Sequence, residues 1–458
     1  MKKRGPIPLA VALALAAAGL AACGGGGNGG GSGGDAGGAA SSASQPSDSA
    51  AGGQADGKAK DPVTLTFLIA NTEDTAPYTK IFDAYEKKTG NKVELQSLPG
   101  GDYDNLIMTR FSTGDLPDLF LMQPGTKQYV KLRAQETLHE WSGESGVWDN
   151  MVDTIKQAQV QDGKIYGVPY GSTGAYGIFY NKDVFAKAGV QPPRNYQDLL
   201  DIAHKIKDAG VTPFYEGVKD GWPTQIFYFT GWVSDVDPAI GADGVEKLNA
   251  NQLKLTDIPQ LKDLFEKQKK LKDDGLMQKN VLAGTYDELQ NEMGEGKVAM
   301  AFMLDGIISQ LEKKFGKDFV RASLGFFPFP SDTDSGTAMI TPPTQLMVPE
   351  KAKHRDAAID LVKFMLQPDN VNSYYADHPG IPIFKGATST LYPAQEDIKK
   401  YIDEGKSQIN IQNRLTASFV NFDKTLQNFF IDGDTDKAIQ DFSDNYQKDG
   451  KAKLLPGF

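Results

Sequence analysis

The chain has 458 residues, of which 40% are apolar and 23% charged, and its formal net charge is -11. This composition excludes a wholly disordered or fibrous chain, and at about 150 residues per domain the length suggests two or three domains. The acidic balance argues against nucleic acid as a partner. No uncharged apolar run reaches the roughly 20 residues that cross a bilayer as a helix, so we do not expect an integral membrane protein.

The N-terminus has the order of an export signal. Basic residues 2–4 precede an apolar stretch over residues 7–22, which ends in small residues. Leu20–Cys23 resembles the lipobox of bacterial lipoproteins, and that resemblance implies cleavage before Cys23 and acylation of its thiol, with palmitate for example. A coincidental cysteine after an ordinary signal peptide is the alternative. We therefore expect a lipoprotein signal peptide at 1–22 and a lipid anchor at the extracellular face of the bacterial cell membrane.

Residues 23–60 are expected to form a disordered tether rich in Gly and Ser. After Cys23, the segment contains no Val, Ile, Leu, Met or aromatic residue. Such a segment cannot bury enough apolar surface to offset the entropy cost of ordering. Its glycines also lack the strand, the helix and the Gly-Lys-Ser/Thr ending of a phosphate-binding loop.

A first α/β unit is predicted from residue 63 onward. Strands are expected at 63–69, 92–98 and 118–122, and helices at 77–89 and 102–113. Gly90 is expected to end the first helix and Asp102 to cap the second. This alternation favours a largely parallel sheet with helices on both faces, where ligands bind beyond the carboxyl ends of the strands. Loops 70–76 and 122–126 are therefore candidate site loops.

A second α/β unit is predicted further along the chain. The expected elements are a strand at 174–181, a helix at 196–209, a helix to 295 that begins with a capping box at 285–288, a strand at 297–303, a helix at 305–315, strands near 321–327 and 337–348, and a helix near 355–366. The C-terminal region is expected to be mainly helical.

No metal site and no catalytic group is evident. The four histidines are far apart with no metal-ligand spacing, and no Gly-x-Ser-x-Gly motif occurs. Residues 432–436 look like the start of a calcium loop, but Lys437 stands where glycine is required, which favours a capped turn between helices. We therefore expect no metal, no cofactor and no catalytic residue.

Aromatic residues gather in one part of the chain. They are Trp222, Phe227, Tyr228, Phe229 and Trp232, with Tyr170, Tyr176, Phe179 and Tyr180 upstream. A pyranose ring can lie on an aromatic face while its hydroxyls bond to Asp, Asn or Gln, so this pattern suits a sugar. Core packing is the alternative, and it is favoured for Phe227 and Phe229. For Trp222, which lies in a turn between Gly221 and Pro223, both interpretations stay open.

Six segments in the same order resemble one family over nearly all of residues 61–458. They are Phe82–Gly90, Gly114–Phe120, Asp162–Tyr170, Tyr180–Gly189, Gly296–Met300 and Ala357–Phe364. Together they are similar to the extracellular solute-binding proteins of family 1, the maltose-binding-protein-like receptors of ABC importers.

The resemblance implies a type II fold with two α/β lobes, each discontinuous in sequence. The implied N-terminal lobe comprises 61–172 and 341–384, and the implied C-terminal lobe 173–340 and 385–458, with hinge crossings near 170–175, 330–343 and 383–390. The implied ligand-binding residues are Glu73, Asp74, Gln123, Tyr170, Ser172, Tyr176, Trp222, Asp305 and Phe419.

From these patterns we expect a monomeric binding protein that is not an enzyme. It would capture a sugar or oligosaccharide by lobe closure and deliver it to the transmembrane permease of an ABC importer. A secreted carbohydrate-active enzyme would need two carboxylates across its substrate and is one alternative. A sugar-sensing subunit of a signalling system is another, and a peptide or polyol could replace the sugar.

Overall fold

The computed structural model describes residues 61–71, 73–99 and 102–458. These residues belong to one compact unit that extends from Lys60 to Phe458. The expected signal peptide, the lipid attachment at Cys23 and the tether lie outside the described residues. Within those residues, no helix has the length and apolar character that crossing a membrane requires.

The N-terminal lobe is built on a five-stranded sheet in the order β2-β1-β3-β12-β6. β1, β2 and β3 are parallel to one another, whereas β12 is antiparallel to β3 and β6. The bounds are Thr64–Ala70 (β1), Lys92–Leu98 (β2), Leu119–Met122 (β3), Gln345–Met347 (β12) and Val168–Pro169 (β6). β3 is buried along its whole length, as expected for a central strand of a sheet covered on both faces.

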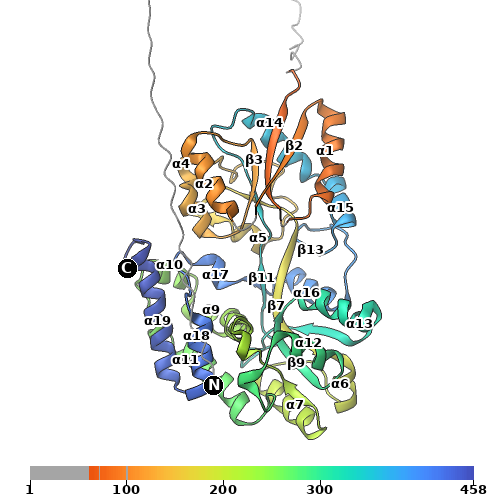
Figure 1. Ribbon diagram of the computed structural model, residues 1–458, viewed down its shortest axis with the longest axis vertical. Helices are drawn as coiled ribbons and strands as arrows, with labels where there is room; N and C mark the ends of the chain where they lie inside the picture. The colour runs from red at the N-terminus through yellow and green to blue at the C-terminus, as the bar shows by residue number, and fades with distance from the viewer. Residues whose placement is uncertain (1–60, 72, 100–101) are drawn as a thin grey trace, which may run out of the picture. The chain divides into compact units, whose positions relative to one another are not determined.

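Helices cover both faces of this sheet (Figure 1). Leu65 and Phe67 of β1 pack in the cluster that also contains Ile81 of α1, whereas Leu68 packs with Ile107 of α2 on the opposite face. The helices of this region are α1 (Ala76–Thr89), α2 (Tyr103–Thr113), α3 (Thr126–Leu132), α4 (Ala134–Thr137), α5 (Asp153–Gln157), α14 (Arg355–Met365) and α15 (Pro368–Asp377), and a small hairpin joins β4 (Val160–Gln161) to β5 (Lys164–Ile165).

The C-terminal lobe contains a second sheet in the order β14-β11-β7-β9-β8. The long strand β7 pairs antiparallel with β9, β10, β11 and β13, while the β8·β9 and β11·β14 pairs are parallel. The bounds are Ser172–Asn181 (β7), Thr212–Phe214 (β8), Val298–Leu304 (β9), Leu324–Phe327 (β10), Ala338–Thr341 (β11), Ile381–Pro382 (β13) and Ser407–Ile409 (β14). This sheet is therefore mixed and mostly antiparallel.

Most of the helices lie in this part of the chain. Their bounds are α6 (Lys182–Ala188), α7 (Tyr196–Asp208), α8 (Gln225–Gly231), α9 (Asp237–Ile240), α10 (Gly244–Asn249), α11 (Pro259–Asp273), α12 (Tyr286–Gly294), α13 (Ile307–Ser323), α16 (Pro393–Asp403), α17 (Ile411–Arg414), α18 (Phe422–Asp432) and α19 (Thr435–Ala452). A five-residue π-helix, Trp232–Val236, continues α8. Short 3-10 turns occur at Val218–Asp220 (η2), Trp222–Thr224 (η3), Leu255–Asp257 (η5) and Val281–Ala283 (η6).

The chain passes between the two sheets at three places. It leaves β6 and enters β7 through residues 170–171, and it leaves β11 and enters β12 through residues 342–344. A third connection runs from α15 through β13, which pairs with β7, to α16. The Tyr375 hydroxyl joins two of these places, because it donates to the Gly171 carbonyl at 2.5 Å and accepts from the Ile383 N–H at 3.1 Å.

Most predicted elements are confirmed, and the α/β two-lobed fold class is confirmed. Gly90 ends α1 at a φ of 78°, where glycine has no Cβ penalty. The Thr285 side chain accepts from the Glu288 N–H, which confirms one half of the expected capping box. Asp434 caps α19 in the same way, by accepting from the Lys437 N–H, so the turn at 432–436 is the capped inter-helix turn that was expected.

Two expectations were wrong. The single strand expected at 337–348 is two strands in different sheets, because Pro342 and Pro343 cannot continue the ladder. Asp102 occupies the position before α2, but its side chain makes no capping bond. The helix expected at 305–315 is confirmed as the first part of α13, because Gly316 is non-helical with a φ of 85°, and a second helical stretch then continues to Ser323.

Asp118 ties β1 to the start of α14 and should make a large contribution to stability. Its buried carboxylate accepts from the Thr66 N–H at 2.9 Å and from the His354 N–H at 2.8 Å. Asp118→Ala leaves both N–H groups without this acceptor, so we expect the free energy of unfolding to fall by about 3 kcal/mol. Urea unfolding at pH 7 measures this change.

The matched control is Asp115→Ala, which removes an exposed carboxylate paired with Arg110 and should cost less than about 1 kcal/mol. Equal losses in the two variants would contradict the role of Asp118.

Candidate binding site

Two carboxylates follow β1 in the N-terminal lobe. The Asp74 Oδ1 accepts from the Ala76 N–H at 3.0 Å, and the Asp74 Oδ2 lies 3.3 Å from the His378 Nδ1. The Ala76 N–H and His378 hold the pKa of Asp74 below its ordinary value. Burial raises the pKa of Glu73, and the nearby His378 partly opposes that effect. The pair therefore combines an exposed, hydrogen-bonded carboxylate with a half-buried one.

A group of tyrosines lies beside Glu73. The ring centroids of Tyr170 and Tyr374 are 5.0 Å apart, and those of Tyr78 and Tyr374 are 5.7 Å apart, both in edge-to-face contact. Tyr170 is 1% exposed, and its hydroxyl donates to the Met365 carbonyl at 3.3 Å. Burial raises the pKa of Tyr78, and the charge of Glu73 contributes to that shift. Tyr170 thus lies within the core of the lobe, next to the Glu73 loop.

A second carboxylate site lies at the end of β9 in the C-terminal lobe. The Asp305 N–H donates to the Ala175 carbonyl at 2.9 Å, which fixes the residue beside β7. Burial raises the pKa of Asp305 to about 6, although the N–H groups of Ala175 and Gly306 oppose the shift. Tyr176 is half-buried, and burial, together with the charge of Asp305, raises its pKa.

Gly174 keeps this site open. A Cβ at Gly174 would lie 2.8 Å from the Thr341 Oγ1 and 3.8 Å from the Asp305 Oδ1. A methyl group at Gly174 would therefore crowd the Thr341 hydroxyl and would come into ordinary van der Waals contact with the Asp305 carboxylate. The three residues, with Tyr176, form a polar site at the end of the strands where the chain crosses toward the other sheet.

Trp222 lies on the short turn η3 and is half-buried. Its ring is in edge-to-face contact with Tyr286, with the centroids 5.0 Å apart and the planes at 72°. Gly221 precedes it at a φ of 76°, a conformation that glycine adopts without strain. Part of the indole is therefore accessible, in contrast to Phe227 and Phe229, which are 0% and 5% exposed.

The remaining predicted residues are dispersed. Phe419 is 7% exposed and packs against Phe442 with ring centroids 4.6 Å apart, inside the aromatic cluster of the C-terminal lobe. Gln123 is exposed directly after β3. Ser172 begins β7, and its Oγ is buried without a hydrogen-bond partner. The structure thus brings together Glu73, Asp74 and Tyr170 on one lobe and Asp305 and Tyr176 on the other.

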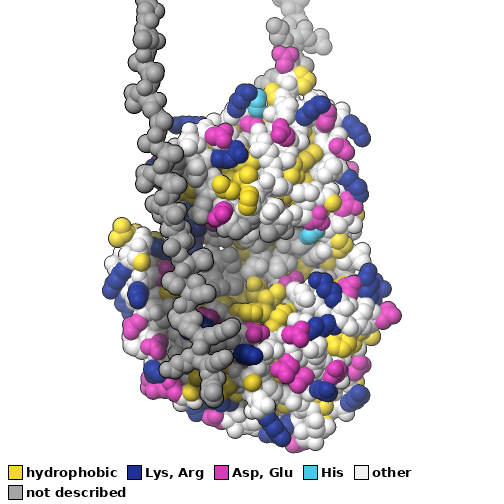
Figure 2. Space-filling view, in the orientation of Figure 1, with side chains coloured by type: hydrophobic (Ala, Val, Ile, Leu, Met, Phe, Trp, Pro, Cys, Tyr) yellow, Lys and Arg dark blue, Asp and Glu magenta, His cyan; other side chains and the backbone are white. Residues whose placement is uncertain are grey.

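The surface is hollowed between the two lobes, and acidic and basic side chains are interspersed over the visible face (Figure 2). One contact joins the lobes next to Gln123, because the Asn413 Nδ2 donates to the Pro124 carbonyl at 3.4 Å. Lys127 follows on α3, and burial lowers its pKa to about 8, with the nearby charge of Lys453, just after α19, adding to the effect.

A cavity of about 950 Å³, whose wall is more apolar than polar, lies on the β14 side of the second sheet. Its lining combines residues 154–163 with residues 242–250 and 408–416, and none of the nine predicted ligand-binding residues is part of it. Five amide side chains line it: Gln157, Gln161, Asn249, Gln408 and Asn413. A volume of this size falls within the range of small-molecule sites, which is about 300 to 1,000 Å³.

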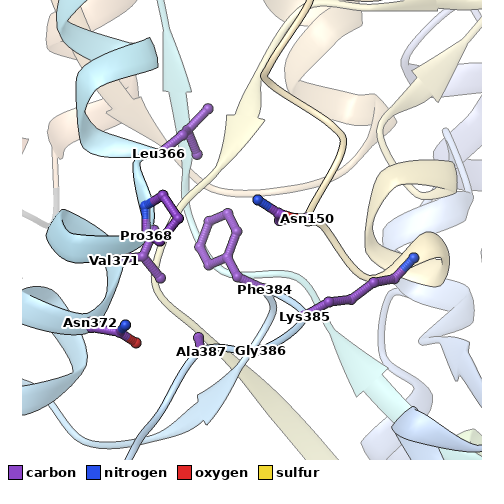
Figure 3. A pocket seen from close by; sticks show the side chains of 9 residues that line it. All are labelled: Asn150, Leu366, Pro368, Val371, Asn372, Phe384, Lys385, Gly386 and Ala387. Carbon is purple, nitrogen blue, oxygen red and sulfur yellow. The ribbon is translucent and has the colours of Figure 1, made fainter.

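A much smaller cavity, about 50 Å³, lies beside the third connection between the sheets. Figure 3 shows the Phe384 ring between Leu366, Pro368 and Val371 on one side and Asn150 on the other. Apolar side chains dominate its wall, and its volume is far below the range of ligand sites. It is therefore a packing defect beside Phe384 and not a candidate ligand site.

Several residues near the carboxylates were not found by sequence reasoning. His378 and Tyr374 contact the Asp74 and Tyr170 groups from more than 200 positions further along the chain. Thr341 pairs with Gly174, beside Asp305, from a strand that was expected to continue unbroken. No pattern of spacing could have joined these residues, since the fold alone brings them together. Among the described residues, no group of three or more His, Cys, Asp or Glu could hold a metal ion.

Two α/β lobes joined by three connections, with polar loops at the strand ends, define the class of two-lobed solute-binding folds. Residues 69–372 match the family of bacterial extracellular solute-binding proteins, and the chain belongs to this family. The predicted family and the prediction of a binding protein rather than an enzyme are thereby confirmed.

Individual relatives are distant in sequence. The chain is 24% identical over 337 residues to the multiple sugar-binding protein of Streptococcus mutans, covering 72% of this chain and 77% of that one. It is 28% identical over 343 residues to an uncharacterized ABC transporter extracellular-binding protein of Pyrococcus horikoshii, covering 72% and 74%. Its fold is similar to that of apo RafE from Streptococcus pneumoniae, with a TM-score of 0.71, 20% identity and coverage of 84% and 98%.

Replacing Asp305 by Asn should change how stability depends on pH. The pKa of Asp305 is about 6 in the folded chain and about 3.9 in an unfolded one, so the folded state holds a proton that the unfolded state has lost between these values. Wild-type stability therefore falls as pH rises from 4 to 6 because of this group, and Asp305→Asn lacks the effect. Thermal unfolding from pH 4 to pH 8 should show the variant gaining relative to wild type up to about pH 6 and no further above it.

The matched control is Asp318→Asn on the exposed side of α13, which should give no such pH-dependent difference. A pH-independent difference for Asp305→Asn would show that its carboxyl is not buried in solution.

Proposed function

We propose that this protein captures a sugar or oligosaccharide between its two lobes and delivers it, unchanged, to the permease of an ABC importer. Family membership carries the proposal. The names of relatives point to the same ligand class, since one is a multiple sugar-binding protein and another a melibiose/raffinose/stachyose-binding protein. A structurally similar protein, RafE, is described in complex with raffinose.

The proposed ligand-binding residues offer complementary chemistry from the two lobes. Glu73 and Asp74 would accept hydrogen bonds from sugar hydroxyls on one side, and Asp305 and Tyr176 would do so on the other. Trp222 would offer an apolar ring face to the C–H face of a pyranose. A ligand that contacts both lobes stabilises the closed form by its higher affinity for that form. Each carboxylate lies on a loop or strand end, and no reaction step is required of any of them.

We further propose the lobe boundaries that the sequence suggested, 61–172 with 341–384 and 173–340 with 385–458. The passages between the sheets at residues 170–171 and 342–344 support this division at two of its boundaries, whereas β13 already pairs with β7 of the second sheet. Closure would then be a rotation about these segments. We also propose that the protein acts as a monomer, since each chain carries both lobes.

Trp222→Ala should weaken binding of the cognate sugar about tenfold, because a stacking contact of about 1 kcal/mol and part of the buried apolar surface are lost. A thermal-shift screen of residues 61–458 against a carbohydrate panel first identifies the ligand, since a ligand selective for the folded state raises the melting temperature. Isothermal titration calorimetry then compares the variants. Trp222→Phe keeps an aromatic face and should bind within about threefold of wild type.

The cavity of about 950 Å³ is the alternative ligand site, and the same variants distinguish it from the proposed one. If Trp222→Ala binds as wild type does while Gln408→Ala loses affinity, the ligand site is the amide-lined cavity and not the proposed one. Release of shorter sugars on incubation with oligosaccharides would instead indicate the enzyme alternative. If no carbohydrate binds and a peptide or polyol does, the ligand class is wrong.

We propose that Cys23 carries a lipid that anchors the protein at the outer face of the cell membrane, with residues 1–22 removed as a signal peptide. The lipobox-like order of Leu20–Cys23 supports this proposal. Cys23→Ser should abolish incorporation of radiolabelled palmitate and move the protein from the membrane fraction to the soluble fraction. Expression in a bacterial host, with Ser32→Ala as a control that keeps the label, measures both effects. A labelled Cys23→Ser protein would contradict the assignment.

A further inference from the structure

Glu216 is a buried acid at the start of the segment 216–224, which carries Trp222. It is 3% exposed, and it lies two residues after β8, just before the turns η2 and η3. Its Oε1 has no hydrogen-bond partner. A carboxylate in this position would be costly, because ionised groups are expensive to bury without a compensating charge or hydrogen bonds. This acid plays no part in the function proposed above.

The Glu216 carboxyl lies near the Tyr228 phenol and the Gln268 amide. The carboxyl faces Tyr228 of α8, whose hydroxyl donates to the Gln268 Oε1 of α11 at 2.7 Å. The Gln268 Nε2 is itself buried without a partner, and the Gln268 amide is the side-chain group that lowers the pKa of Glu216. Glu266 on α11 adds negative charge near Tyr228. Among the described residues, no Lys, Arg or His is a cause of the Glu216 pKa shift.

The backbone of Glu216 is held on both sides by Gln278. The Glu216 N–H donates to the Gln278 Oε1 at 3.0 Å, and the Gln278 Nε2 donates to the Glu216 carbonyl at 2.7 Å. Gly284 approaches the same carbonyl so closely that a Cβ there would lie 2.2 Å from it. The backbone of Glu216 is thus held in place at the start of the segment.

The segment folds back from this point onto itself. A Cβ at Gly217 would lie 2.9 Å from the Pro223 Cγ, so the residue after Glu216 is in close contact with the residue after Trp222. The Thr224 Oγ1 donates to the Gly221 carbonyl at 2.6 Å, which closes the η3 turn. Glu216 is therefore linked, through the close packing of Gly217 on Pro223, to the residue that directly follows Trp222.

We propose that Glu216 is a positioning residue that, as the neutral acid enclosed with Gln268 and Tyr228, holds the Trp222 segment in the conformation that receives the ligand. Ionisation of Glu216 places a negative charge in this buried environment. The segment that carries Trp222 then shifts outward, so that the carboxylate is no longer buried. The inference rests on the proposed sugar site for its consequence, but the link between Glu216 and Trp222 can be tested without any ligand.

The direction of the expected pH effect follows from the burial of Glu216. Burial raises the pKa of Glu216 to about 8, far above the value of about 4.3 for an exposed glutamate. The acid is therefore mostly neutral at pH 7 and becomes charged as pH rises through 8. The Trp222 environment should change over that range, and sugar affinity should fall about tenfold between pH 7 and pH 9.

Fluorine NMR of protein labelled with 5-fluorotryptophan reports on Trp222 directly. The chain has 4 tryptophans, and Trp222→Phe identifies the Trp222 line. In the wild type we expect this line to shift with a midpoint near pH 8, and in Glu216→Gln to stay in place from pH 6 to pH 9. Glu288→Gln is the control, because Glu288 accepts from the Tyr215 hydroxyl in the same region at 2.9 Å, and it should keep the wild-type titration.

The proposal would be overturned by a Trp222 fluorine line whose chemical shift does not change with pH in the wild type, or changes equally in Glu216→Gln. A purely structural role would change the melting temperature of Glu216→Gln without changing this titration. If Glu216→Gln does not fold, Gln268→Met decides, because loss of the amide that lowers the Glu216 pKa should move the midpoint to higher pH. An unmoved midpoint there would also overturn the proposal.

Affinity for the sugar found by the panel is compared at pH 7 and pH 9 in wild type and Glu216→Gln. Burial also lowers the pKa of Lys127 to about 8, so only the difference between the two proteins is assigned to Glu216. The loss should be confined to wild type, and an equal loss in both would overturn the link to binding. Absence of any sugar binding would contradict the proposed function alone, because the fluorine titration would still decide the role of Glu216.

Discussion

The ten-residue strand β7 is the element on which the rest of the structure depends. It pairs with four other strands, and its residues alternate between two hydrophobic clusters: Ala175 and Phe179 pack in one, and Ile178 and Tyr180 in the other. Its first residue follows the connection from the N-terminal sheet directly. Because both faces are buried and a shift by one residue would exchange them, its register is strongly fixed. Asp305, Tyr176 and Gly174 owe their positions to that register.

Sequence patterns predicted the elements whose burial is periodic. The helix that ends at Gly90 and the helix that begins at Asn195 have a regular apolar face and a recognisable end, and both formed as expected. Patterns failed where tertiary contacts decide the outcome. A run of apolar residues at 337–348 looks like one strand, yet its two ends belong to different sheets, and only the three-dimensional path of the chain separates them. The direction of strand pairing is likewise not encoded in the alternation of elements.

The candidate site was predictable only in part, for the same reason. Loops that follow β1 and β3 can be located from a strand-and-loop pattern, and Trp222 stands out because glycine and proline flank it. The aromatic count is a poor guide, however, because Phe419 and Tyr170 are as buried as ordinary core residues. His378 cannot be found by pattern analysis, although, after the Ala76 N–H, it also lowers the pKa of Asp74. Partners of this kind come from distant segments and need the fold.

The two lobes differ in how they would hold a polar ligand. On the N-terminal lobe, Asp74 is exposed and already bonded to a backbone N–H and to His378, so it can accept further bonds at little desolvation cost. On the C-terminal lobe, Asp305 has lost most of its solvent, and burial raises its pKa to about 6. A hydroxyl that bonds to a poorly solvated carboxylate replaces water that is no longer there, so each such bond contributes more than it would in water. Specificity is therefore expected to reside mainly with Asp305, where an ill-fitting ligand leaves a poorly solvated carboxylate with only its backbone N–H partners.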